Sequence, residues 1–538
     1  RRISRRQFLA GAAGVVGAAW LPMGRVSVAA GEGPAGFPAG IELYRQRFQT
    51  WSKEIVIDDL WTCRPTSPEQ VVAIANWAAS AGWRVRPRGS MHGWSPFVIT
   101  PGTTSAANVV LVDTAGLASL TAEPAGVRVG AGAHLEDVLT HLEARNLGLP
   151  SVPAVGDVTV GGMLAIGAHG AATHAGSLSH AARELTAVVW DQPSRRYVLR
   201  TFDRDDAELA SLSCALGRTF VTEAILDASP LEHLRCRSSV DISAAELFAA
   251  PGGSGRTLAS FFEATGRAEA LWYPFTDNPW LKVWEVRPHR SLTSRPTNGP
   301  YNYPFSDQIP EEVADLASQL VTGSPEATPA FGQMVYAFTA AGLAASAAYD
   351  LWGPAKDTQL YIRATTLRVR ELGLAVLTSR ADLQHTVHVL ASSWARLIDE
   401  HASRGSYPIN MPFEIRASGL DGGRGDAPIL AATSPDPSAR HMDVVLYTNA
   451  LTLTGTAGSD AFFTEYERHV RRTLDGRRAR LRPEWSKNFA YSSAGPTTDI
   501  AAWRTRNASW DGAAATFDRL DPHGVFTNDF LDVLFERF

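Results

Sequence analysis

The sequence predicts an α+β protein with two large domains, and three features of the chain lead to this prediction. The chain has 538 residues, which is more than one hydrophobic core usually holds. Hydrophobic residues make up 45% and charged residues 20%, in the range of globular rather than disordered or membrane proteins. Short β-like runs alternate with helical stretches up to about residue 230, and longer extended segments follow.

The first 30 residues are predicted to be a secretory leader that is removed from the mature protein. They have a basic start, an apolar run from Phe8 to Leu21, and a stretch at 27–29 that resembles a cleavage site. Residues 4–9 resemble the twin-arginine signal, whose pathway exports proteins already folded around a cofactor. We therefore expect secretion, or export to the cell envelope of a bacterium. The alternative, a membrane anchor, is disfavoured because the apolar run is shorter than the roughly 20 residues that span a bilayer.

Residues 31–230 are predicted to form the first domain, of mixed α and β structure. Short β-like runs lie at 56–57, 85–86, 109–112 and 127–129. A helix is expected over 68–81, where Pro68 suits the first turn. A second helix is expected over 135–145, with a stop at 146–148.

Residues 231–498 are predicted to form the second domain. Extended apolar segments are predicted at residues 269–286 and 442–454, and helices at 310–320 and 381–403. Surface loops rich in Gly, Pro, Ser and Asp are predicted at 288–300 and 419–437.

Charge and cysteine content exclude several classes of function. The net charge of −5 provides no broad basic surface, so we expect no nucleic-acid partner. Cys63, Cys214 and Cys236 lie far apart and cannot form a four-ligand zinc site. At most one disulfide is possible, and buried free thiols are the favoured alternative. The chain has neither G-x-S-x-G nor H-E-x-x-H, and its close histidine pairs lack a third ligand, so no metal is expected.

A first candidate cofactor loop spans residues 86–95, with the sequence R-P-R-G-S-M-H-G-W-S. A glycine-containing turn after a strand can present backbone N–H groups as a concave site for a pyrophosphate, and Arg88 could add positive charge. His92 would then stand beside the cofactor. The alternative is that His92 is a hydrogen-bonded structural residue.

A second candidate loop spans residues 156–170, G-D-V-T-V-G-G-M-L-A-I-G-A-H-G. Its glycines allow the backbone to approach a ligand closely, as the pyrophosphate and ribose of a dinucleotide require. From this segment alone, an ordinary glycine-rich turn is equally consistent.

Taken together, the two loops resemble the FAD-binding domain of the vanillyl-alcohol-oxidase family, also called the p-cresol methylhydroxylase type. The resemblance implies an FAD-binding domain of two α/β subdomains, a substrate domain with a large antiparallel sheet flanked by helices, and a C-terminal segment, 499–538, that returns to the FAD-binding domain. It also implies FAD bound covalently through His92. The other implied cofactor-binding residues are Pro87, Arg88, Gly89, Ser90, Met91 and Gly93 in the first loop, Asp157, Thr159, Gly161, Gly162, Ala165, Gly167, His169 and Gly170 in the second, and Ile225 and Asn528.

The second domain resembles that of the covalent-FAD (type II) cholesterol oxidases. The similar segments are residues 272–284, 413–421, 482–487 and 521–528, so the resemblance covers nearly the whole mature chain. The E-I-R element at 414–416 is shared with alditol and sugar-lactone oxidases and indicates only the superfamily. The aromatic run W-Y-P-F-T-D-N-P-W-L-K-V-W at 272–284 indicates the sterol branch.

Glu414 and Arg416 form the candidate catalytic pair. On a strand they are two residues apart and project to the same face. A neighbouring cation favours the carboxylate, whereas burial favours the neutral acid, so the pair can be adjusted for proton transfer. The alternative is a surface ion pair of no functional importance.

The resemblance also assigns the reaction and the roles. Hydride passes from the carbinol carbon of a 3β-hydroxysteroid to FAD, the double bond isomerises to the conjugated enone, and O2 is reduced to hydrogen peroxide. Glu414 is the acid/base of the isomerisation, and Arg416 stabilises negative charge. Asp277 is the acidic gate residue that meets Arg416, Asn449 hydrogen-bonds the steroid hydroxyl, and Lys487 lies near N1 of the flavin.

The implied partners are a small-molecule sterol and O2, with a transient contact at a membrane surface to extract the sterol, and the protein is expected to be a monomer. The alternative within the family is an alditol or sugar-lactone oxidase, which needs a polar rather than an aromatic pocket. An alternative from another class is an exported binding protein whose flavin site is a relic.

Overall fold

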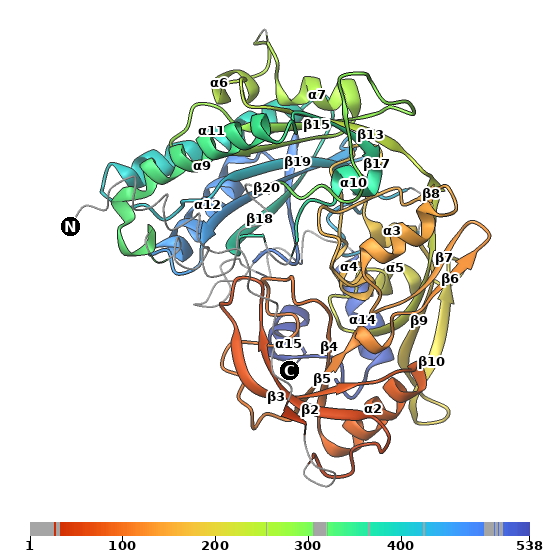
Figure 1. Cartoon of the computed structure of the whole chain (residues 1–538). Helices are drawn as coiled ribbons and strands as arrows, with labels where there is room; N and C mark the ends of the chain where they lie inside the picture. The colour runs from red at the N-terminus through yellow and green to blue at the C-terminus, as the bar shows by residue number, and fades with distance from the viewer. Residues whose placement is uncertain are drawn as a thin grey trace.

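The structure of the chain, a computed structural model, describes residues 26–27, 33–253, 255–304, 319, 321–363, 366–422, 426–488, 500, 504 and 509–537. Figure 1 shows two halves: two smaller sheets with their helices below, and a large sheet flanked by helices above. This is the predicted α+β arrangement, with helices and sheets mixed in both halves.

The first sheet has five strands in the order β1-β2-β3-β5-β4. β3 and β4 both pair in parallel with β5, and helix α2 connects β3 to β4. α2 spans Pro68–Ala81, as predicted, and Gly82 ends it in the left-handed conformation with φ 69°. The strands are β1 (Val26–Ser27), β2 (Glu42–Gln49), β3 (Val56–Arg64), β4 (Arg84–Arg88) and β5 (Val109–Asp113).

The second sheet is antiparallel, in the order β10-β9-β11-β7-β6, and a two-stranded pair, β8 with β12, lies apart from it. The predicted glycine-rich loop at 156–170 contains a short helix, α4, which begins after Thr159 and ends at Gly167 with φ 65°. The elements are β6 (Leu120–Glu123), β7 (Gly126–Gly130), α3 (Leu135–Glu143), β8 (Leu147–Gly148), α4 (Val160–Ile166), β9 (Ala182–Asp191), β10 (Arg196–Asp203), α5 (Leu209–Leu212), β11 (Phe220–Asp227) and β12 (Ser229–Pro230).

The third sheet has nine strands in the order β16-β17-β13-β15-β14-β19-β20-β18-β21 and is antiparallel except where β16 meets β17. The predicted large antiparallel sheet is therefore confirmed. The strands are β13 (His233–Ser239), β14 (Ala268–Trp272), β15 (Trp280–Val286), β16 (Arg295–Pro296), β17 (Asp350–Pro354), β18 (Val369–Thr378), β19 (Phe413–Gly419), β20 (Val444–Leu453) and β21 (Ala479–Pro483).

Helices α7, α11 and α12 pack together over one face of this sheet (Figure 1). α11 covers all but the ends of the predicted helix at 381–403, whereas the predicted helix at 310–320 lies outside the described residues apart from Gln319. The helices of this half are α6 (Ala244–Leu247), α7 (Leu258–Thr265), α9 (Thr328–Ala345), α10 (Ala355–Gln359), α11 (Leu383–Ala402) and α12 (Ser459–Thr473). A 3₁₀ turn in this half spans Pro325–Ala327, and the first half has 3₁₀ turns at Thr114–Gly116 and Leu178–Ala181.

Strand β19 shows how the sheet separates a core from a site. Phe413, Ile415 and Ala417 point to the helices, and the Phe413 ring stacks on Trp394 of α11 with centroids 5.0 Å apart. Because side chains alternate along a strand, Glu414 and Arg416 point to the opposite face. That face is turned toward the first half of the chain.

The C-terminal helices α14 (Trp510–Leu520) and α15 (Asp529–Phe535) lie among the elements of the first half, in blue in Figure 1. The turn between them is held at Asp521, whose buried carboxylate pairs with Arg218 at 3.0 Å and accepts from the Tyr197 hydroxyl. The same carboxylate accepts from the backbone N–H groups of Val525 and Phe526.

The predicted leader lies outside the described residues except for 26–27, so export stays a prediction from sequence. Within the described ranges, no helix has both the length and the apolar character that a membrane crossing needs. The three cysteines are buried free thiols. The described His, Cys, Asp and Glu side chains form no group of three or more suited to a metal ion.

Candidate active site

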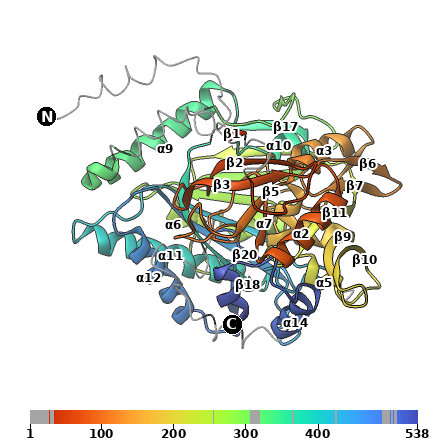
Figure 2. The ribbon, with the colours of Figure 1, turned by 90° about the horizontal axis from the view of Figure 1, so that it is seen from below.

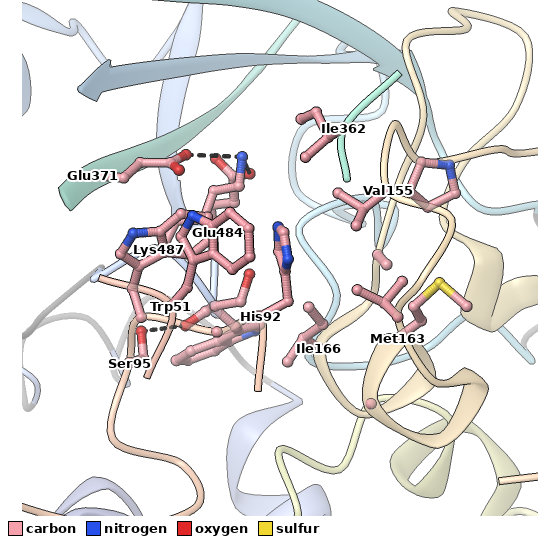
Figure 3. Close-up of a pocket in the computed structure, with 18 of the residues that line it drawn as sticks. Trp51, His92, Ser95, Val155, Met163, Ile166, Ile362, Glu371, Glu484 and Lys487 are labelled. Atoms are coloured by element: carbon pink, nitrogen blue, oxygen red, sulfur yellow. Dashed lines mark hydrogen bonds and ion pairs between the residues drawn. The ribbon is translucent and has the colours of Figure 1, made fainter. Parts of the chain in front are cut away.

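A cavity of about 880 Å³ lies where the first half of the chain meets the nine-stranded sheet. This volume is within the roughly 300–1,000 Å³ that is usual for small-molecule sites. Both predicted cofactor loops and the Glu414/Arg416 pair contribute to its wall. Figure 3 shows Lys487 near Glu371 and Glu484 on one side, and Met163 and Ile166 on the other, with His92 between them.

His92 lies against aromatic rings in the first loop. The Trp51 ring is tilted over the imidazole, with centroids 4.0 Å apart, and Trp94 meets it edge-on at 5.7 Å. Burial lowers the pKa of His92 to about 3, and the nearby charges of Lys487 and Arg368 act in the same direction. The imidazole is therefore neutral at physiological pH, so one of its ring nitrogens carries a lone pair, and the residue lines the cavity.

The two cofactor loops are in direct contact. A Cβ atom on Gly89 would lie 2.3 Å from the Thr159 Oγ1 atom, so only glycine permits this approach. The predicted cofactor-binding residues of the loops that line the cavity are Pro87, Gly89, Ser90, Met91, His92, Gly93, Thr159, Gly161, Gly162, Ala165, Gly167 and His169. A wall rich in glycine and apolar side chains, with the imidazoles of His92 and His169, fits a dinucleotide that bears a flat aromatic ring system.

Glu414 and Arg416, the predicted catalytic pair, lie in the middle of the large sheet, on β19. Arg416 Nη1 lies 2.7 Å from Glu414 Oε1 and 3.4 Å from Glu269 Oε1, so one nitrogen bridges two carboxylates. Strand register explains this: Glu414 is opposite Leu271 and Arg416 is opposite Glu269 across β14 and β19. Residues directly opposite on paired strands share a face.

The two carboxylates differ in acidity. Burial raises the pKa of Glu414 to about 8, with the charge of Glu269 adding to the effect and Arg416 opposing it. Glu269 is equally buried, yet Lys282 and Arg416 together lower its pKa to about 2. Glu414 thus holds a proton near neutral pH while Glu269 is ionised.

A second charged cluster lies beside the first. Lys487 Nζ is 2.8 Å from Glu371 Oε1 and 3.2 Å from Glu484 Oε1. Glu484 also accepts from Asn449 Nδ2 at 2.8 Å and contacts His169 Nε2 at 3.3 Å. This cluster provides a buried network of proton donors and acceptors at the edge of the cavity.

His169 and Gly373 position this second cluster. The His169 ring stacks on Tyr447, with centroids 3.4 Å apart and an interplanar angle of 6°. A Cβ atom on Gly373 would come within 2.6 Å of Glu484 Oε2 and 2.7 Å of Lys487 Cβ. Glycine at 373 is therefore what lets Glu484 and Lys487 reach over β18.

The predicted contact between Asp277 and Arg416 is wrong. Asp277 is exposed in the connection between β14 and β15, and its backbone carbonyl accepts from Ala244 N. That connection is closed by a turn, in which Thr276 Oγ1 donates to the Tyr273 carbonyl, and this turn leaves Asp277 outside the cavity. The acidic partner of Arg416 in this region is Glu269.

Asn449 is on the predicted face, opposite Glu414, but it is not part of the cavity wall because its amide is hydrogen-bonded to Glu484. Asn528 is likewise absent from the wall. Its side chain caps α15 and donates to the carbonyls of Pro96 and Phe97, which fixes the chain just after the first loop.

Four other predicted cofactor residues, Arg88, Asp157, Gly170 and Ile225, do not line the cavity. Arg88 lies 3.6 Å from the carboxylate of Asp113, whereas its neighbour Arg86 reaches the cavity wall. Gly170 packs against the backbone of Val152. A β-bulge between Val221 and Glu223 interrupts the alternation of side chains, so Val221 lines the cavity and Ile225 does not.

Several residues of the site were not predicted: Trp51, Glu269, Lys282, Glu371 and Glu484. Glu269 and Lys282 are charged residues within a segment that reads as extended and apolar, and this was a usable signal. Glu484 lies three residues before the predicted Lys487. Trp51 and Glu371 carry no comparable signal in the sequence.

Comparison with protein families gives two matches. Residues 61–191 match the model of an FAD binding domain. Residues 233–536, more than half of the chain, match a model described as cholesterol oxidase, substrate-binding. A curated relative, L-gulono-1,4-lactone dehydrogenase from Mycobacterium tuberculosis, is 26% identical over 488 residues, which cover 90% of this chain and 97% of the relative.

Two solved structures share both sequence and fold with this chain. The cholesterol oxidase from Brevibacterium sterolicum is 40% identical, with a TM-score of 0.89 over 94% of this chain and 99% of that one. A solvent-stable cholesterol oxidase is 41% identical, with a TM-score of 0.89 over 94% of this chain and 100% of that one.

The raised pKa of Glu414 predicts a pH-dependent change in stability. The folded protein holds this proton up to about pH 8, whereas an unfolded glutamate releases it near 4.5, so stability falls as pH rises through this range. Glu414→Gln removes the ionisable group and therefore this loss of stability with rising pH. We expect the unfolding temperature of the variant, relative to the parent, to rise progressively between pH 5 and pH 8, as checked by thermal denaturation of the purified flavoprotein.

The matched control is Glu263→Gln, at an exposed glutamate on α7. We expect it to leave the pH dependence of unfolding unchanged. A Glu414→Gln variant that parallels the parent across the whole pH range would show that Glu414 ionises normally in the folded protein.

Proposed function

This chain belongs to the cholesterol oxidase family of FAD-dependent oxidoreductases, and from that premise we propose that it oxidises the 3β-hydroxyl group of a sterol. The observation that carries the proposal is the cavity: the buried Glu414/Arg416 pair faces it from the sheet, and His92 faces it from the first loop. Most of the remaining wall is apolar, with Leu271, Phe331, Met334, Val335 and Leu451 on the side of the large sheet. A rigid apolar molecule with one hydroxyl group matches such a wall.

In the proposed oxidation, FAD and Arg416 have separate roles. When bound, FAD supplies the hydride acceptor for the carbinol carbon and the route by which O2 becomes hydrogen peroxide. Arg416 stabilises the negative charge that develops on the substrate oxygen as the hydroxyl proton leaves. Burial strengthens this interaction because water does not screen it.

We infer that Glu414 moves the proton of the isomerisation. In its ionised form it removes a proton from the carbon between the new ketone and the double bond, and it returns that proton to the far carbon of the double bond. The electron pair shifts by one bond, so the product is a conjugated enone with no net gain or loss of protons. A pKa near 8 keeps both forms of Glu414 accessible near neutral pH.

The alternative substrate is an alditol or sugar lactone, and the similarity to the lactone dehydrogenase is its main support. A polyol needs several hydrogen-bonding groups along its length. On the side of the large sheet, the charged residues of the cavity wall lie around Arg416 and Lys487, and the neighbouring wall is apolar. This distribution favours the sterol.

Turnover of cholesterol and xylitol tests the proposed substrate. We expect hydrogen peroxide release with cholesterol and none above background with xylitol. Glu414→Gln should still form the unconjugated ketone but slow its isomerisation by about 10²- to 10⁴-fold, the usual contribution of a general acid–base. Turnover of xylitol without cholesterol would reject the sterol assignment, and an unchanged isomerisation rate in the variant would reject the role of Glu414.

We further propose that His92 is the covalent attachment point of FAD. Its imidazole is neutral and is held against the Trp51 ring at the cavity wall. The bond would join an imidazole nitrogen to the 8α carbon of the flavin, with loss of one hydrogen from each, and O2 would take up the two hydrogens as hydrogen peroxide.

Acid precipitation tests this attachment. We expect the parent to keep its flavin in the protein pellet and His92→Ala to release it, and the tryptic peptide that contains His92 to carry the mass of FAD. His134→Ala is the control, because His134 lies 3.5 Å from the Ser90 hydroxyl but outside the cavity wall. A His92→Ala protein that retains acid-stable flavin would disprove the assignment.

We also propose that helix α9 contacts a lipid surface when the enzyme takes up its sterol. Its 18 residues include no charged side chain. Phe331, Met334, Val335 and Phe338 line the cavity, and Phe338 is nevertheless 46% exposed. Figure 2 shows α9 at the outer edge of the molecule. An uncharged helix that reaches from the cavity to the surface suits the transfer of an apolar molecule out of a bilayer.

Co-sedimentation with phosphatidylcholine vesicles tests this contact. We expect Phe338→Asp to weaken vesicle binding by about tenfold, because an aspartate is costly to bring against lipid. Val533→Asp is the matched control, since Val533 is 47% exposed on α15 in the other half of the molecule. Equal binding of the parent and both variants would argue against a role for α9.

A further inference from the structure

Lys282 is a fully buried cation at the edge of the active site. Its side chain has no exposed surface, and three aromatic rings surround its ammonium group. The Nζ atom lies 3.4 Å from the centroid of Tyr361, 4.2 Å from that of Trp280 and 5.1 Å from that of Tyr303. A buried lysine needs compensation for lost hydration, and its carboxylate partner is Glu269, 3.3 Å away.

Lys282 begins a row of alternating charges that ends at the catalytic glutamate. Lys282 is opposite Glu269 across β15 and β14, and Glu269 is opposite Arg416 across β14 and β19. Arg416 in turn pairs with Glu414, two residues earlier on the same strand. The four side chains therefore lie on one sheet face and are linked by contacts of 3.3, 3.4 and 2.7 Å.

The row is asymmetric about Arg416. Glu269 contacts two cations and also accepts from the Tyr361 hydroxyl at 2.6 Å. Glu414 contacts a single cation among the described residues, Arg416, which it shares with Glu269.

The other charged groups near this row belong to the second cluster. Lys487 acts on Glu414 from the chain after β21, and Glu484 acts on Arg416 from the same segment. Glu371 and His169 complete that cluster. None of these groups is among the largest influences on the charge of Glu269. Because Arg416 is shared by both carboxylates, the contacts that distinguish Glu269 from Glu414 are the ion pair with Lys282 and the hydrogen bond from Tyr361, and of these two only Lys282 brings a charge.

We propose that Lys282 decides which of the two carboxylates at Arg416 carries the exchangeable proton, by holding Glu269 ionised and so leaving the proton on Glu414. Lys282 is a positioning residue in this scheme, because it acts through Glu269. The proposal rests on the proposed isomerisation for its functional meaning, but the location of the proton is a property of the fold alone.

The direction in which the pH midpoint of isomerisation shifts distinguishes this role from the direct effect of removing a positive charge near Glu414. Removal of a nearby cation would ordinarily make Glu414 a weaker acid. If Lys282 instead sets the position of the proton, removal of Lys282 moves the proton to Glu269. Glu269 is then neutral, and Arg416 forms an ion pair with Glu414 alone. Glu414 would become ionised at lower pH.

The kinetic experiment supplies the unconjugated 5-en-3-one directly to the holoenzyme and follows formation of the conjugated enone across pH. In the parent we expect the rate to rise with pH as Glu414 ionises. In Lys282→Met we expect the midpoint of this rise to fall by about one unit or more, so that the variant isomerises faster than the parent at mildly acidic pH. A midpoint that rises or stays in place overturns the proposal.

The matched control is Lys356→Met. Lys356 is a largely buried lysine paired with Glu143 and Asp357 on α10, outside the cavity wall. We expect its removal to leave the midpoint unchanged. If Lys282→Met does not fold, Lys282→Gln keeps a hydrogen-bond donor beside Glu269 without the charge, and the same direction of shift is expected.

Infrared spectroscopy locates the proton without any reliance on catalysis. Tyr361 donates to Glu269, and Glu269 is also hydrogen-bonded to Glu414, so Tyr361→Phe should shift the C=O stretch of a protonated carboxyl strongly when the proton is on Glu269 and only weakly when it is on Glu414. We expect the weak shift in the parent and the strong shift in the Lys282→Met background.

The two readouts separate the possible failures. A parent enzyme that does not isomerise the unconjugated 5-en-3-one would remove the proposed isomerase function and leave the infrared result to decide the role of Lys282. An infrared shift as large in the parent as in the Lys282→Met background would refute that role.

Discussion

The contact on which the active site depends is the bridge that Arg416 makes between Glu414 and Glu269. Three ionisable groups are buried together, and an unpaired charge at this depth would be strongly destabilising. The sheet therefore has to supply counter-charges in register. It does so by placing Glu269 and Lys282 on the two neighbouring strands, so that the pairing of β14, β15 and β19 determines the electrostatics of the site.

The same strands also make the core of the second half. Alternation along β19 directs Phe413 and Ile415 to α11 and directs Glu414 and Arg416 to the cavity. A sheet with an apolar face under helices and a charged face toward the cofactor loops is a rigid support for catalytic groups. Substitutions that shift the register of one strand would thus affect folding and chemistry together, because each strand serves both faces.

The cofactor side is built differently, from loops that hold one another. Gly89 allows the first loop to touch Thr159 of the second, and Asn528 near the C-terminus binds the carbonyls that follow the first loop. The returning C-terminal helices are anchored at Asp521 by Arg218 and Tyr197. Residues far apart in the chain therefore fix the position of His92 relative to the sheet that carries Glu414 and Arg416.

Local patterns in the sequence were sufficient for the features that depend on neighbours along the chain. Pro68 and the residues after it determine α2, and the spacing of Glu414 and Arg416 places them on one face of a strand. Only the tertiary structure decided which groups meet across strands. It placed Glu269 at Arg416 through the pairing of β14 with β19, and it left Asp277 at the surface in the connection between β14 and β15. Glu269 and Arg416 are 147 positions apart in the chain, so no short-range pattern encodes the register that brings them together.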